Sequence, residues 1–126
     1  MSGPVQPLQE RRALNEGIED AFIETARYAA GIRTFNVIHR GVIIDLYEMF
    51  YYNFAILVEL TEGVEGLEKD GGKEVIGNVR TWLSENNYSR SEADIKRRCE
   101  SGLELFSRFK VVMSNRGLLS LPSRGR

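Results

Sequence analysis

The amino-acid sequence predicts an all-α protein, and two observations carry this prediction. Apolar residues recur every three or four positions in four separate segments, whereas no segment shows the strict alternation of apolar and polar residues that is typical of strands. The chain has 126 residues, the usual length of one domain. We therefore expect a four-helix domain, with one helix short, around a long and mostly buried central helix. The helical domain is predicted at 8–117, between an extended N-terminal lead at 1–7 and a C-terminal arm at 118–126.

The first helix is predicted over residues 8–31. Two prolines keep the lead extended, and Pro7 is well placed to open a helix because its fixed φ angle suits the first turn. Gly31 is the expected end of the helix. The segment 32–41 fits either a kinked continuation or a short connection. The apolar residues at helical spacing are Leu14, Ile18, Phe22, Ala29 and Ile32.

The central helix is predicted over residues 35–68, and it contains the most apolar stretch of the chain, 42–60. On a helical projection three acids form one narrow polar stripe, whereas Phe50, Phe54 and Leu57 are expected to be buried. Each carboxylate would cost about 2.5–3.5 kcal/mol in mid-membrane, while each apolar residue returns roughly 0.3–0.6 kcal/mol. The stretch therefore predicts a core helix, with no membrane as a partner. The three acids are Asp45, Glu48 and Glu59.

Two further helices follow a glycine-rich turn at 69–72. The short third helix is predicted at 73–85. The fourth helix is expected to begin at Ser89 or Ser91, because Ser89 and Glu92 have the spacing of a capping box, and to end near Gly117. The residues expected on its buried seam are Ile95, Cys99, Gly102, Phe106, Phe109 and Met113.

Catalytic and metal-binding side chains are scarce in this chain. With one cysteine and one histidine, Cys99 and His39, no intrachain disulfide and no multi-cysteine metal site can form, and no nucleophile–base pair is evident. The glycines match neither a phosphate-binding loop nor a dinucleotide fingerprint. Asp45 and Glu48 have the spacing of two metal ligands but lack the Glu-x-x-His pairs of carboxylate-bridged metal sites. The sequence thus predicts a protein that is not an enzyme and uses no cofactor, in an intracellular, cytoplasmic location.

Charge is unevenly distributed and gives the clearest indication of a partner. Residues 1–63 hold 5 basic and 9 acidic residues, whereas residues 64–126 hold 12 basic and 9 acidic residues. No acid follows Glu104. Because apolar residues in a short tail must dock somewhere, we expect the arm to bind this domain or a neighbouring subunit. The predicted partner-binding residues are Leu118, Leu119, Leu121, Arg124 and Arg126.

A basic face on the fourth helix provides an alternative interpretation. Arg90, Arg97 and Arg108 align on a helical projection, so with Lys110 they could follow a nucleic-acid backbone. Lys96 and Arg98 lie beside them in the sequence. Intervening acids, such as Glu104, dilute this face and favour an ordinary solvated surface instead.

The expected function is that of a non-enzymatic assembly or adaptor subunit of a larger, homo-oligomeric or mixed protein complex. The alternative is a small helical subunit that binds a nucleic-acid backbone. In size, helix count and C-terminal tail the chain resembles the small helical head–tail connector proteins of tailed viruses, which form rings and send C-terminal arms into the adjacent ring. That resemblance implies a structural protein within a virion.

Overall fold

The computed structural model describes residues 8–34, 40–86 and 91–119, and within these ranges it is all-α, as predicted. Four helices and no strand occur in the described part of the chain. The helices are α1 (Leu8–Thr34), α2 (Arg40–Thr61), α3 (Gly72–Glu85) and α4 (Glu92–Asn115), and a 3-10 turn, η1 (Lys69–Gly71), leads into α3.

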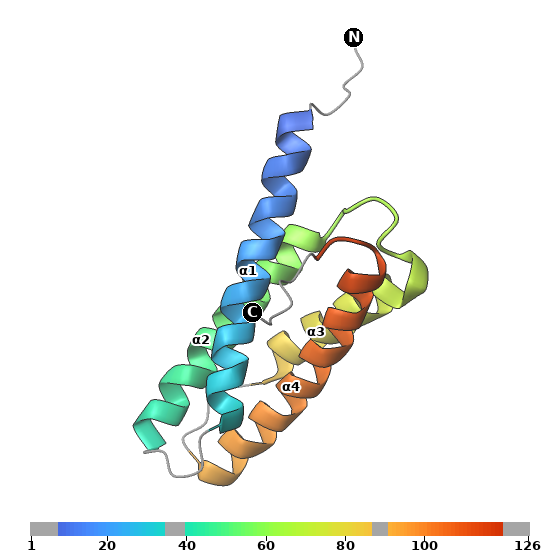
Figure 1. The fold of residues 1–126 in the computed structure, drawn as a ribbon. Helices are drawn as coiled ribbons and strands as arrows, with labels where there is room; N and C mark the ends of the chain where they lie inside the picture. The colour runs from blue at the N-terminus through green and yellow to red at the C-terminus, as the bar shows by residue number, and fades with distance from the viewer. Residues whose placement is uncertain (1–7, 35–39, 87–90, 120–126) are drawn as a thin grey trace.

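The helices form two antiparallel pairs, α1 with α2 and α3 with α4 (Figure 1). Helix α2 packs against each of the other three helices, which confirms its central position. It is shorter than the predicted long helix, and only 33% of its most apolar window is buried. The first turns of α1 project beyond the other helices, and residues 9–13 are accordingly exposed (Figure 1). This arrangement leaves one side of α2 facing outward.

The core is built around Phe54, which is fully buried on α2. Its ring lies 5.7 Å from Trp82 of α3 and 5.9 Å and 5.8 Å from Phe106 and Phe109 of α4, measured between ring centroids. Helix α1 joins the cluster through Phe22, whose ring stacks on Phe106 at 4.9 Å. One group of aromatic rings therefore fixes all four helices relative to one another.

The predicted faces of α2 are confirmed, with one difference. Phe50, Phe54 and Leu57 are fully buried, and the three acids at 45, 48 and 59 are exposed. However, Val42, Met49 and Tyr52 are also exposed. The outward side of α2 is therefore wider and more apolar than the narrow polar stripe that the sequence predicted.

Helix α2 ends seven residues earlier than the predicted end at 68. Gly63 has a φ angle of 85°, a left-handed conformation that terminates the helix, and the buried hydroxyl of Thr61 donates to the carbonyls of Leu57 and Val58. The apolar spacing continues through Val64 and Leu67 because both still pack on the core, although neither is helical. Spacing alone could not distinguish these turns from a helix.

Helix α1 continues past its predicted end at Gly31, to Thr34. A glycine here does not stop the helix because the next residue, Ile32, is buried and holds the last turn on the core. Gly31 itself faces Leu46 of α2, where an added Cβ would meet the leucine at 3.6 Å. The predicted start of α2 at residue 35 lies outside the described residues, in which α2 begins at Arg40.

Helix α4 begins immediately after Ser91, one of the two predicted starts. Ser91 is the N-cap, and its hydroxyl accepts a hydrogen bond from the Asp94 amide at 3.4 Å. Because Glu92 is the first helical residue, the capping box predicted from Ser89 and Glu92 is wrong; Ser89 itself lies outside the described residues. All six residues of the predicted seam are buried.

Candidate functional site

The first two residues of the predicted arm pack on this chain itself. Leu118 and Leu119 are half-buried against the hydrophobic core. They are placed by the end of α4, where Gly117 has a φ angle of 70° and the Leu118 amide donates to the Met113 carbonyl at 2.9 Å. The helical unit thus extends two residues beyond the predicted boundary at 117. Leu121, Arg124 and Arg126 lie outside the described residues.

The predicted basic face is divided by the structure. Arg97 and Arg108 are both exposed on the side of α4 away from the core, with exposed Glu104 between them on the same face. Arg97 forms an ion pair with Asp94 at 2.8 Å. Lys110 is exposed on a different side of the helix, and Arg90 lies outside the described residues.

Cys99 is buried, as predicted, and burial raises the pKa of its thiol to about 11, with a smaller contribution from Glu100. A thiol in this environment stays protonated and unreactive near neutral pH. Within the described ranges, no group of three or more His, Cys, Asp and Glu side chains could hold a metal ion. His39 lies outside those ranges.

The outer face of α2 consists of Val42, Asp45, Met49, Tyr52, Ile56 and Glu59. These residues alternate in steps of three and four, the spacing of a seam at which a second helix or an extended segment packs. Val42, Met49 and Tyr52 are 47%, 42% and 65% exposed, and Ile56 is half-buried. Three of the five large hydrophobic side chains exposed in the described part of the chain therefore lie on this one face.

The same helix meets the requirements of a membrane span by length and composition. Gly41–Thr61 has a mean hydropathy of 1.3 in its most apolar window, of which 33% is buried within the fold. One such helix is weak evidence, because the core helix of a soluble protein satisfies the same criteria. The full burial of Phe50, Phe54 and Leu57 identifies α2 as a core helix with one side uncovered.

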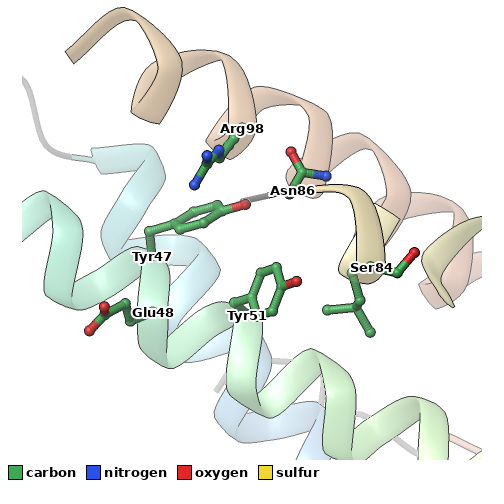
Figure 2. A pocket seen from close by; sticks show the side chains of 7 residues that line it. Tyr47, Glu48, Tyr51, Ser84, Asn86 and Arg98 are labelled. Carbon is green, nitrogen blue, oxygen red and sulfur yellow. The ribbon is translucent and has the colours of Figure 1, made fainter. Parts of the chain in front are cut away.

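A pocket of about 410 Å³ lies between α2, α4 and the end of α3. Figure 2 shows Arg98 of α4 above the ring of Tyr47, with Tyr51 beside it and Asn86 opposite. The guanidinium carbon of Arg98 is 5.9 Å from the Tyr47 ring centroid. The pocket is lined by Tyr47, Glu48, Tyr51, Leu83, Ser84, Asn86 and Arg98.

Arg98 is the most unusual residue of the pocket, since only 7% of its surface is exposed. Its guanidinium has no ion pair or hydrogen bond within the described part of the chain, and its one specific contact is with the Tyr47 ring. In the described part of the chain, the buried side-chain nitrogen and oxygen atoms without a hydrogen-bond partner are the hydroxyl of Tyr47 and the indole nitrogen of Trp82. The guanidinium nitrogens of Arg98 are not among them, because they reach solvent. Burial raises the pKa values of Tyr47 and Tyr51, and the charge of Arg98 partly opposes this shift. The pocket thus combines aromatic walls with a guanidinium that has no ion pair within the described residues.

Sequence reasoning missed this site. Arg98 was assigned to the solvated face of α4 with Lys96 and Arg97, but it lies three residues after Ile95 and four before Gly102, on the buried seam. That spacing was a usable signal. Tyr47 and Trp82 are buried in the fold, whereas Tyr52 is exposed.

Comparisons of the chain with protein-family models, curated proteins and solved structures find no match.

Proposed function

We propose that this protein is a non-enzymatic assembly subunit, in which the outer face of α2 binds the basic C-terminal segment, residues 120–126, of another copy. The observation that supports this most strongly is the clustering of Val42, Met49 and Tyr52 on an uncovered face of a core helix. Exposed apolar patches of this kind commonly mark protein–protein interfaces.

Charge complementarity selects the C-terminal segment as the occupant of this face. The outer face of α2 carries Asp45 and Glu59 and no basic residue, whereas residues 120–126 contain Leu121, Arg124 and Arg126 and no acid. The arginines suit carboxylate partners because guanidinium can donate two parallel hydrogen bonds. One leucine and two arginines match a face that is part apolar and part acidic.

A second α2 helix fits this face less well. Parallel pairing would place Asp45 opposite Asp45 and Glu59 opposite Glu59, and antiparallel pairing about Tyr52 would place Asp45 opposite Glu59. Like charges face each other in both cases, which is destabilising. The face is therefore better suited to a basic segment than to itself.

Each contact of this type is weak. Burial of one leucine contributes about 1.5–3 kcal/mol, and each exposed ion pair contributes about 0.2–1 kcal/mol, before the ordering cost of the segment. A head-to-tail contact can close into a ring, in which each subunit both donates and accepts a segment, and closure raises the effective concentration. Such arm exchange is also the plan of the connector proteins that the sequence resembles.

The test is the molar mass of Met49→Lys, measured by light scattering over a range of protein and salt concentrations. A lysine at this position removes apolar surface and repels the arginines, so the variant should stay monomeric where the native chain assembles. Ile23→Lys is the matched control, because Ile23 is 40% exposed on α1 and Met49 is 42% exposed. A native chain that remains monomeric at all concentrations would contradict the proposal, as would an assembly that Met49→Lys leaves unchanged. Assembly that requires added nucleic acid would favour the alternative function instead.

A further inference from the structure

We infer that the pocket between α2, α4 and the end of α3 binds a small organic acid, with its oxyanion paired to Arg98 and its apolar body against Tyr47, Tyr51 and Leu83. The inference is independent of the proposed assembly, since no residue that lines the pocket belongs to the outer face of α2. It starts from an arginine that is only 7% exposed, whose guanidinium opens to the pocket and has no ion pair in the described part of the chain.

A largely buried guanidinium loses part of its hydration, and a contact with an aromatic ring or an anion can compensate for that loss. Contact with the Tyr47 ring supplies part of this compensation, because a guanidinium over an aromatic face is attracted to it. A cation–π contact does not use the hydrogen-bond donors of the guanidinium, which remain directed to the pocket and its solvent. These donors form a planar fork that matches a carboxylate or a phosphate.

The chain itself offers no clear counter-charge for Arg98. Neither Asp nor Glu occurs in residues 1–7, 35–39, 87–90 or 120–126, so none of these segments can supply a side-chain carboxylate. Asp70 precedes α3, whose 14 residues place it about 20 Å from the end of the helix that lines the pocket. Glu48 lines the pocket, but no ion pair joins it to Arg98, and Figure 2 shows its carboxylate turned away from the guanidinium. No described side-chain carboxylate pairs with Arg98, which leaves its guanidinium available to an external anion.

The size and walls of the pocket define the rest of the ligand. A volume of about 410 Å³ is within the range of small-molecule sites. The rings of Tyr47 and Tyr51 lie 5.9 Å apart, and with Leu83 they give an apolar surface next to the charge. The amide of Asn86 adds a polar group on the opposite side, although its nitrogen already donates to the Trp82 carbonyl at 2.6 Å. This arrangement favours an acid with an apolar or aromatic body over a small inorganic anion.

The test uses the indole N–H of Trp82, the only tryptophan in the chain, as a nuclear magnetic resonance reporter. Its ring lies 5.4 Å from Tyr51 and 6.2 Å from Tyr47, so a ligand that packs against the two tyrosines should shift its signal. The probes are benzoate, neutral benzamide, acetate and inorganic phosphate. Benzoate should give a saturable shift and bind more tightly than the other three. Tighter binding of phosphate would reassign the site to phosphate compounds and overturn the organic-acid assignment, and equal binding of benzamide would show that the charge has no role.

Three variants separate binding by Arg98 from a purely structural role. Arg98→Met should weaken benzoate binding by at least about tenfold, because a hydrogen bond to a charged group is worth about that factor or more. Arg97→Met is the matched control: it removes the same charge from the exposed neighbour and should leave binding unchanged. Glu48→Gln removes an exposed carboxylate from the pocket mouth without touching the core, and should tighten binding severalfold even if Arg98→Met fails to fold. Absence of a saturable shift with the native chain, or the same affinity in Glu48→Gln, would overturn the inference.

Discussion

At the scale of single residues, Gly102 shows how closely the core is packed. An added Cβ would lie 2.6 Å from the Trp82 ring and 2.8 Å from the Phe50 ring, both of which are held by other aromatic side chains. Alanine would improve helix propensity by about 1 kcal/mol, but overpacking a core usually costs about 1–3 kcal/mol. The absence of a side chain at this position lets α2 and α3 approach α4.

We therefore predict that Gly102→Ala destabilises the protein by up to about 2 kcal/mol, measured by urea denaturation. Gly77→Ala provides the control, because Gly77 is exposed in the middle of α3 and an added Cβ would contact nothing within 4 Å. That substitution should stabilise the protein by about 0.5–1 kcal/mol. If Gly102→Ala also stabilised the protein, the aromatic rings around Gly102 would have to move aside at little cost, which would contradict the prediction.

The buried thiol of Cys99 and the buried phenol of Tyr47 predict how stability depends on alkaline pH. Burial raises the pKa of Cys99 to about 11 and also raises the pKa of Tyr47, so both groups are neutral in the folded protein. What these two groups contribute to the free energy of unfolding is fully present below the ordinary pKa that each has in the unfolded chain, about 8.5 for a thiol and 10 for a phenol. It is lost as the pH rises from there toward the folded pKa, because the unfolded chain releases its protons first.

The free energy of unfolding should thus be flat from about pH 7 to 8.5 and fall steadily above that. Tyr47→Phe should lessen the fall above about pH 10, whereas Tyr52→Phe, at an exposed position, should not. Urea titrations at several pH values measure this dependence. Identical alkaline profiles for the native chain and Tyr47→Phe would mean that the Tyr47 hydroxyl is hydrated.

At the scale of helices, the start of α4 depends on one hydroxyl. Ser91 caps the helix by accepting from the Asp94 amide, so Ser91→Ala should cost about 0.5–2 kcal/mol. Ser101→Ala, at an exposed position within the same helix, should change stability by less than about 0.5 kcal/mol. Denaturant midpoints for the two variants give the comparison, and equal midpoints would contradict capping by Ser91.

The helices themselves could be predicted from the sequence because each buries one continuous apolar stripe. This holds for the seam of α4 from Ile95 to Met113, and for the buried face of α2 around Phe54. Helix ends were less predictable, since they depend on backbone conformation: Gly63 adopts a positive φ angle and ends α2, whereas Gly31 remains helical inside α1. Nothing in the local sequence distinguishes these two glycines.

The pocket was harder to predict than the helices because it depends on tertiary contacts. Tyr47 and Tyr51 come from α2, Asn86 from the end of α3 and Arg98 from α4. The phase of Arg98 on the seam could have indicated that it is buried, but not which side chains surround it. Similarly, the exposure of Met49 and Tyr52 depends on which side of α2 the other helices leave uncovered.

At the scale of the whole molecule, four helices enclose one aromatic core. Within the residues that the structure describes, the outer face of α2 is uncovered and the charge of Arg98 has no ion pair. The proposed assembly assigns the outer face to the C-terminal segment of another copy. Since Leu118 and Leu119 pack on their own core, that segment starts from a fixed point at the end of α4. Removal of residues 120–126 should therefore leave the helical content unchanged, as measured by circular dichroism.

The most direct test of the proposed assembly is to mix two variants that are each incomplete. A chain ending at Leu119 keeps the α2 face but lacks the segment, and Met49→Lys keeps the segment but has a blocked face. Each variant alone should sediment as a monomer in analytical ultracentrifugation, and their mixture should form a one-to-one complex that weakens with added salt. A mixture that sediments as two separate monomers, under conditions where the native chain assembles, would contradict docking of the segment on α2 of another copy.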